Sequence, residues 1–178
     1  MSITIAYRDI EDIIDDVIAR LNDATYGLNA AITAINTQKS AIDTAHSRVV
    51  MTVPKFVNNS GTETLTENQN LFFFVAEEIV NCDPFMVVAL PTWTTDEMGA
   101  ETATVEFLIY MEDPSDGTDP RRKLLRYVRA LKEVMRDMPF DDSIVTETKT
   151  GIIEPGFTPV TESRSYYSAG VKLELVYA

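Results

Sequence analysis

Cysteine and histidine are almost missing from this 178-residue chain, which has one of each, Cys82 and His46. A single cysteine cannot form an internal disulfide, so the chain is no disulfide scaffold, and a reducing compartment is its simplest setting. The two residues are too few for a zinc cluster, and neither lies in a motif typical of a nucleophilic dyad. The seven glycines are scattered singly, which excludes a glycine-rich phosphate loop. We therefore predict a protein that is not an enzyme and uses no metal or other cofactor.

Basic residues and long apolar runs are scarce as well. The chain has 15 Lys and Arg against 28 Asp and Glu, a net charge of −13. Such a charge repels phosphate backbones and anionic membranes and favours solubility. No apolar run approaches the about 18 residues that span a bilayer, and residues 1–9 lack the charge order of a signal peptide. We expect an acidic soluble domain that makes protein contacts and has no membrane partner.

The first 45 residues have the pattern of helix. Apolar residues recur at helical spacing from Ile10 to Leu21, with Asp and Glu on the other face. Apolar residues also recur every seven positions, as in a coiled-coil seam, at Tyr7, Ile14, Leu21, Leu28, Ile35 and Ile42. Gly27 is unfavourable inside a helix and suits the position after a helix end at Tyr26, so we expect either one weakened helix or two helices. The seam either covers the domain's own sheet, which we favour, or packs against another subunit.

After the helical region, the spacing of apolar residues changes from helical to alternating. From Arg48 apolar residues alternate with polar ones through Val49, Met51 and Val53, which predicts a strand that ends at Pro54. Residues 58–70 are polar and predict an exposed loop or arm. We take Asn59, Ser60 and Gly61 in this segment as candidate contact residues.

Three apolar segments come next. Residues 71–80 are apolar enough to be buried, but their short run leaves strand and helix equally open. The continuous run 85–90 is typical of a strand covered on both faces. Alternation over residues 103–111 predicts a half-buried strand, the clearest in the chain.

The second half of the chain is expected to begin with a helix and end with strands. Asp119 and Pro120 suit the N-cap and first position of a helix that we expect to end by Pro139. Its predicted inner face comprises Leu124, Leu125, Val128, Leu131 and Met135. Residues 143–178 predict strands joined by a turn at Pro155-Gly156, and the last strand should pair with or lie beside 103–111, odd-numbered residues facing the helices. We interpret the acidic residues 112–119 as a helix-capping turn and not as a calcium loop, because Pro114 and Lys123 would occupy positions where a calcium loop needs oxygen ligands.

Together these elements predict one α+β domain over residues 1–178. Its single, mostly antiparallel sheet should have about four to six strands. The N-terminal helical region, residues 1–45, and the later helix should pack on that sheet. Residues 48–178 then form the α+β core, with the polar arm near residues 58–70.

Positive charge is concentrated in the predicted helix. Residues 121–136 contain seven of the 15 basic residues and carry +6, which leaves −19 on the rest of the chain. Four arginines fall on one stripe outside the leucine face: Arg122, Arg126, Arg129 and Arg136. The stripe either pairs internally with acidic residues, or orients contact with another copy or an acidic partner. A third interpretation is that a ring of such helices faces DNA in a channel.

The order of elements, the segment from Pro120 to Leu131 (PRRKLLRYVRAL) and the ending from Glu162 to Ala178 (ESRSYYSAGVKLELVYA) resemble phage tail terminator proteins. These are also called tail-completion or head-tail joining proteins. The resemblance covers roughly residues 48–178 and implies a small α+β subunit without a catalytic site. It implies a homo-oligomeric ring, expected to be a hexamer, on the head-proximal end of the tail tube. The long helical N-terminus departs from the family's plan.

From this resemblance we expect a structural protein of the virion neck, assembled in the host cytoplasm. It would end tube polymerisation and offer a docking surface to neck or connector proteins. Its partners would be further copies of itself, the tail tube protein, neck proteins and DNA passing through the ring. One alternative is another neck component, such as a head-tail adaptor or stopper. A rival from another class is a cellular enzyme or regulatory domain whose site is assembled from scattered residues.

Overall fold

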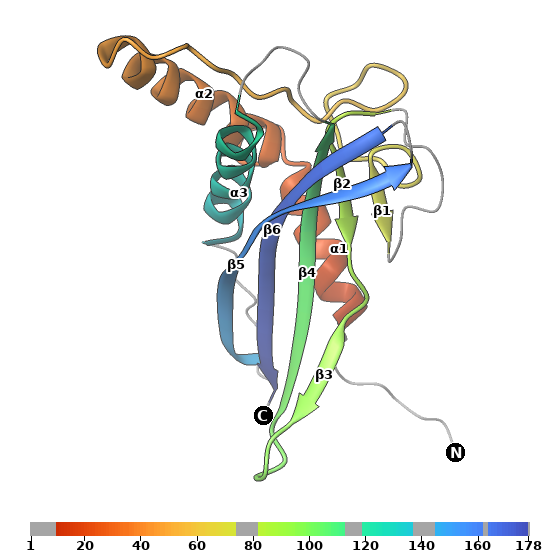
Figure 1. Ribbon diagram of the computed structural model, residues 1–178. Coiled ribbons are helices and arrows are strands. Elements are labelled where there is room, and N and C mark those ends of the chain that lie inside the picture. Colours follow the sequence, from red (N-terminus) through yellow and green to blue (C-terminus); the bar gives the residue numbers. More distant parts are fainter. Residues whose placement is uncertain (1–9, 74–81, 113–118, 137–144, 162–163, 178) are drawn as a thin grey trace.

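The computed structural model describes residues 10–73, 82–112, 119–136, 145–161 and 164–177. In these ranges three helices and six strands form an α+β fold (Figure 1), which confirms the predicted class. The helices are α1 (Ile10–Leu21), α2 (Leu28–Ala45) and α3 (Pro120–Arg136). The strands are β1 (Leu71–Phe73), β2 (Phe85–Val88), β3 (Thr92–Thr95), β4 (Glu101–Glu112), β5 (Val145–Thr161) and β6 (Arg164–Tyr177).

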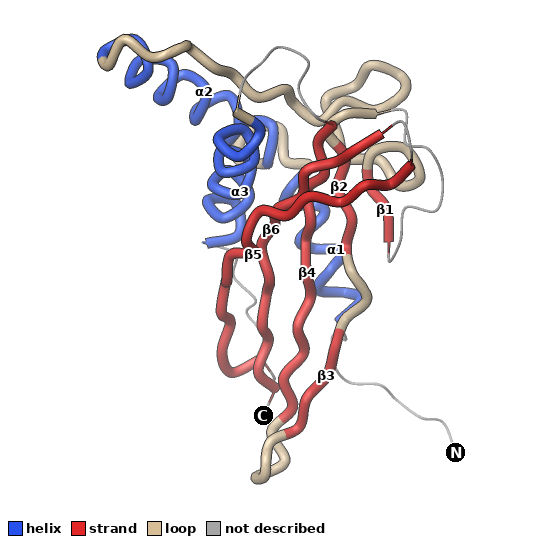
Figure 2. Tube along the Cα trace, in the orientation of Figure 1, coloured by secondary structure: helices blue, strands red, loops and turns tan. Residues whose placement is uncertain are grey.

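All strands belong to one sheet, whose order is β1-β2-β4-β6-β5, with β3 paired to the start of β4. Only β1 and β2 pair in parallel; the other pairs in the described ranges are antiparallel. The long strands β4 and β6 pair along the full length of β4, from Glu101 opposite Tyr177 to Glu112 opposite Tyr166 (Figure 2). The predicted pairing of the segments 103–111 and 171–177 is therefore confirmed.

The main core lies between the helices and one face of this sheet. That face presents the odd-numbered residues of β4 and β6, such as Val105, Phe107 and Leu173, all buried. Side chains of all three helices join them in a single cluster, among them Val17, Ile32 and Leu131. Strict alternation along β4 separates this face from the other, so the predicted orientation of the odd-numbered residues is confirmed.

Strand β2 is covered on both faces, as its continuous apolar run predicts. Met86 and Val88 belong to the main core, whereas Phe85 and Val87 form a second cluster with Tyr166 of β6. In this cluster the Phe85 ring stacks on that of Tyr110, with 5.1 Å between centroids. The open segment 71–80 begins as strand β1, and its remainder lies outside the described residues.

The N-terminal region consists of two helices that meet at Gly27, one of the two expected forms. Helix α1 ends earlier than expected, at Leu21, and Gly27 is the N-cap of α2. The Asp23 carboxylate accepts hydrogen bonds from the backbone N–H groups of Thr25 and Tyr26, which turns the chain. A Cβ atom at position 27 would lie 2.3 Å from the Asp23 carbonyl oxygen, so this close turn requires glycine.

The helices cover the domain's own sheet, as favoured from the sequence. Leu21, Leu28 and Ile35 of the sevenfold pattern are buried in the main core. Ile42 is 37% exposed, because the C-terminal end of α2 projects away from the sheet (Figure 1).

Three asparagines, also seven residues apart, hold the segment that follows α2. The side-chain amides of Asn22, Asn29 and Asn36 each donate to a backbone carbonyl and accept from the N–H of the same residue. The residues held in this way are Leu65, Phe56 and Val53 respectively.

The predicted strand at 48–53 is therefore wrong. Met51 and Val53 are buried as the alternation requires, but side chains of α2 and of the α1–α2 connection take the place of a neighbouring strand.

The predicted turn at Pro155-Gly156 is also wrong. Strand β5 runs through both positions, and its pairing with β6 shifts between Ile153 and Gly156. An irregularity of this kind accommodates a proline that cannot donate a ladder hydrogen bond. The expected helix stop at Pro139 lies outside the described residues, and α3 is described to Arg136.

Candidate interaction surface

Helix α3 carries most of the predicted contact residues, and its start is fixed by Asp119. The Asp119 carboxylate accepts a hydrogen bond of 2.9 Å from the backbone N–H of Arg121, while Pro120 takes the first helical position. This confirms the predicted cap and helix. The helix lies over β6 and β5 on one side and against α2 on the other, so its buried surface is wide.

Two arginines of the predicted stripe point inward to a buried acid. Asp43 of α2 accepts hydrogen bonds from Arg126 at 2.6 Å and from Arg122 at 2.8 Å. Arg126 is only 6% exposed and also donates to the Met51 carbonyl. The assignment of Arg126 to an exposed contact stripe is therefore wrong, and the alternative of internal pairing holds for these two arginines.

The charges in this cluster stabilise one another. Burial alone would raise the pKa of Asp43, but the Arg126 hydrogen bond and the positive charges of Arg122 and Arg126 outweigh it. The pKa of Asp43 is consequently held below its ordinary value. Since removing one partner would leave a buried charge uncompensated, the cluster joins α2, α3 and the Met51 segment.

The outward stripe of α3 is displaced from the predicted one. It follows helical spacing and consists of Arg121, Leu125, Arg129, Lys132, Glu133 and Arg136. Leu125, assigned to the inner face by its apolar character, is 54% exposed and lies among these cations. Arg136 pairs with Glu133 at 2.9 Å, an exposed pair of the i,i+3 type.

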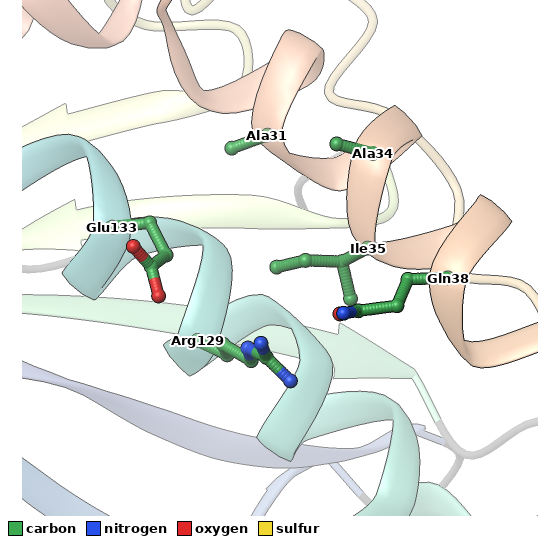
Figure 3. A pocket seen from close by; sticks show the side chains of 6 residues that line it. All are labelled: Ala31, Ala34, Ile35, Gln38, Arg129 and Glu133. Atoms are coloured by element: carbon green, nitrogen blue, oxygen red, sulfur yellow. The ribbon is translucent and has the colours of Figure 1, made fainter. Parts of the chain in front are cut away.

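A groove of about 490 Å³ runs between α2 and this stripe (Figure 3). The α2 wall is mostly apolar and consists of Ala31, Ala34 and Ile35, with the polar Gln38 beside them. The opposite wall carries Arg129 and Glu133 of α3, whose charged groups face the groove in Figure 3. Small side chains on α2 leave room beside a charged rim, which suits a partner with both apolar and charged groups.

A surface of opposite sign lies on α1. Its outward residues Glu11, Asp12, Asp15 and Asp16 are all exposed, while Ile13, Ile14 and Val17 face the core. Figure 1 shows the start of α1 on the far side of β4 from α3. Helices α1 and α3 cover the same face of the sheet and contact each other, and the acidic and basic surfaces lie on these two separate helices.

The predicted contact residues Asn59, Ser60 and Gly61 are exposed at the tip of a folded loop, not on an extended arm. The Asn58 carboxamide oxygen accepts hydrogen bonds from the Ser60 backbone N–H and hydroxyl. The Asn59 backbone N–H donates to Gln69, and Gly61 adopts a positive φ of 81°. Internal bonds thus define the shape of this loop.

Cys82 and His46 lie in different parts of the fold. Cys82 donates a hydrogen bond to the Asn59 side chain, and burial raises the pKa of its thiol. His46 is exposed at the C-terminal cap of α2. Across the described residues, no three His, Cys, Asp or Glu side chains are grouped to hold a metal ion, and none of the described helices is long and apolar enough to cross a membrane.

Asp43 and the asparagines Asn22, Asn29 and Asn36 were not predicted as structural residues, although the sequence around each of them contains a recognisable pattern. Asp43 lies on the same helical face as the buried Leu28, Ile32 and Ile35, an apolar stripe where an acid needs a cation. Asn22, Asn29 and Asn36 each follow a member of the sevenfold apolar pattern by one position.

In sequence comparisons, no protein-family model and no curated protein matches the chain.

Proposed function

We propose that the chain is a structural virion subunit that assembles with copies of itself into a ring at the head-proximal end of a phage tail tube. The ring ends tube growth and offers its other side to the neck. The observation that carries this proposal is the separation of charge, with acidic residues on α1 and basic residues on α3. Identical copies that meet head to tail bring unlike surfaces together, which is the arrangement that closes into rings.

The order of elements is a second support. The strands through β4, helix α3 and a closing strand pair follow one another as in the tail terminator plan that the sequence resembles, whereas the two N-terminal helices depart from that plan. Strand β6 contains most of the ending that is one of the features behind that resemblance.

The subunit exposes apolar side chains at two separate ends, as a joint between two partners requires. The turn between β3 and β4 exposes Met98, and Trp93 of β3 is 49% exposed nearby. The opposite end, beyond α2, exposes Val49 and Val50 (Figure 1). Apolar side chains at both ends supply separate contact areas for a tube ring and a neck ring.

The experiment is native mass measurement of the purified protein alone and after mixing with tail tubes, with electron microscopy of the same tubes. We expect a closed oligomer bound at one end of each tube, and the resemblance implies that it is a hexamer. Tubes that carry it should no longer elongate. Matched tubes incubated without the protein should continue to grow. A protein that stays monomeric and leaves tube growth unchanged would contradict the proposal.

A further inference from the structure

We infer that the extended segment after α2 has an open backbone edge at Val50 and Thr52, and that this edge pairs with an extended, acidic segment of a partner protein, as a strand is added to a sheet. This deepens the proposed function and rests on it, because the end beyond α2 is one of the two ends that meet another ring. Figure 1 shows the segment running back along α2 toward the sheet.

The inner side of this segment is already paired. Asn36 holds both backbone groups of Val53. The Met51 N–H donates to the Asp43 carboxylate, and the Met51 carbonyl accepts from Arg126. Side chains of α2 and α3 thus occupy the side on which a sheet would place one neighbouring strand.

The outer side of the segment has no such partners. In an extended chain the backbone groups of successive residues point to opposite sides, so those of Val50 and Thr52 point away from the groups that hold Met51 and Val53. Both residues are exposed, and their N–H and carbonyl groups make no hydrogen bond with any residue that the structure describes. These groups are left to water, as at the edge of a sheet.

The edge is short and lined by β-branched residues. It ends at Pro54, which has no N–H and whose carbonyl accepts from the Tyr127 hydroxyl at 2.8 Å. Val49 and Val50 are 72% and 50% exposed, and Thr52 is exposed beside them. Valine and threonine favour strand pairing, so the edge suits a short added strand.

The described charges at this end select an acidic occupant. Lys39 and Arg48 form no ion pair with a described residue, whereas Asp43 is buried and compensated by two arginines of α3. Further along the segment, Lys55 pairs with Glu63 at 2.7 Å, and the pair adds no net charge. Carboxylates beside the added strand would therefore meet positive charge that is not yet compensated.

The start of α3 belongs to the same end, since Arg122 reaches Asp43. Residues 119–126 contain four basic residues against one acid, Asp119. The Asp119 carboxylate is engaged with the backbone N–H of Arg121, whose side chain is exposed. This part of α3 therefore adds positive charge and does not repel an acidic segment.

The probe is a short synthetic peptide in which valine and threonine alternate, with glutamates at both ends. In the natural protein alone, the Val50 and Thr52 N–H groups should exchange hydrogen fast and the Val53 N–H slowly. The peptide should slow exchange at Val50 and Thr52. The same peptide with lysines in place of the glutamates should bind at least about threefold more weakly at low salt, and high salt should shrink the difference.

A pair of variants tests the backbone itself. Thr52→Pro removes a donor of the edge, and Thr52→Val is the matched control that keeps it. The Thr52 N–H makes no described hydrogen bond and its backbone is extended, so circular dichroism should show both variants folded. We expect the dissociation constant of the glutamate peptide to rise about three- to tenfold for Thr52→Pro and to stay near the natural value for Thr52→Val.

A third variant does not depend on the folding of the proline variant. Arg48→Glu leaves every backbone group in place and reverses an exposed charge beside the edge. It should weaken binding of the glutamate peptide by about threefold or more at low salt and strengthen binding of the lysine peptide. In assembled tails with their necks, the Val50 and Thr52 N–H groups of the natural protein should be protected.

Four results would overturn the inference. One is unchanged exchange at Val50 and Thr52 with millimolar glutamate peptide, and another is equal binding of that peptide by the two Thr52 variants. The third is fast exchange of both groups in assembled tails with their necks. The fourth is protection of both groups in the natural ring alone, which would make a second copy the occupant. In each case tube capping by the natural protein still supports the proposed function, which fails separately if that protein forms no oligomer and leaves tube growth unchanged.

Discussion

Asn36 holds Val53 through two hydrogen bonds, in which its side chain donates to the Val53 carbonyl at 2.8 Å and accepts from the Val53 N–H at 2.9 Å. Val53 is buried, so its backbone N–H and carbonyl groups cannot form hydrogen bonds with water unless the segment moves. A neighbouring strand would offer the same two bonds, and here one helix side chain offers both.

Replacing Asn36 with alanine should therefore cost about 1–3 kcal/mol of unfolding free energy, since it orphans a buried donor and acceptor. Amide hydrogen exchange gives a direct measurement, because the Val53 N–H should lose protection. The control is Thr37→Ala, next along α2, whose exposed hydroxyl bonds only within the helix. Retained protection at Val53 in the Asn36 variant would contradict the assignment.

The Asp43 cluster predicts a particular acid response. Because its folded pKa is lowered, the Asp43 carboxylate stabilises the fold fully above roughly pH 4, the ordinary range of a carboxyl group. That contribution is lost as pH falls through the lower folded value. The Asp43→Asn variant should thus have a melting temperature well below that of the natural protein at pH 7. The difference between the two melting temperatures should narrow toward pH 3.

Thermal melts across that pH range measure the gap. Glu97→Gln, which removes a carboxylate from the exposed turn after β3, is the control and should follow the natural protein throughout. A gap for Asp43→Asn that stays constant with pH would show that charge is not the source of its effect.

The Asp119 cap should contribute about 1 kcal/mol, and Asp119→Ala should lower the melting temperature by about 2–4 °C. Asp119→Asn keeps an oxygen that can accept from the Arg121 N–H and should melt near the natural protein. Equal melting of the alanine and asparagine variants would rule out the cap as the cause.

The two faces of β6 should respond in opposite ways to substitution. Leu173 is 1% exposed in the main core, so Leu173→Asp should cost more than about 4 kcal/mol and leave most molecules unfolded. Glu174 points to the other face and pairs with Lys172, and Glu174→Gln should leave the protein folded. Soluble yield and circular dichroism measure both, and a folded Leu173→Asp protein would mean that the faces are misassigned.

Local periodicity was enough to predict β4, β6 and α3. Each has a regular alternation or helical stripe, and its two faces meet environments of clearly different polarity. The pattern failed at Leu125, an apolar residue on the exposed face, and at Arg126, a cation that reaches a buried acid. Residue type predicts burial only on average, and a partner 83 residues away is not visible in a local window.

The extended segment after α2 shows a second limit. Its alternation correctly indicated buried Met51 and Val53, but period two reports an extended backbone and says nothing about what bonds to it. The partners are asparagines from helical sequence, which strand rules do not consider. At Pro155-Gly156 the rule that favours a turn was overridden by continuous pairing on both sides.

The uninterrupted pairing of β4 with β6 determines how the subunit bears mechanical load. A pull between the β3–β4 tip and the helical end runs along these strands. Slipping β4 past β6 must then break their hydrogen bonds together, from Glu101 opposite Tyr177 to Glu112 opposite Tyr166, and cannot peel them off one at a time. We therefore expect tension along this axis to load the hydrogen bonds between β4 and β6 in shear.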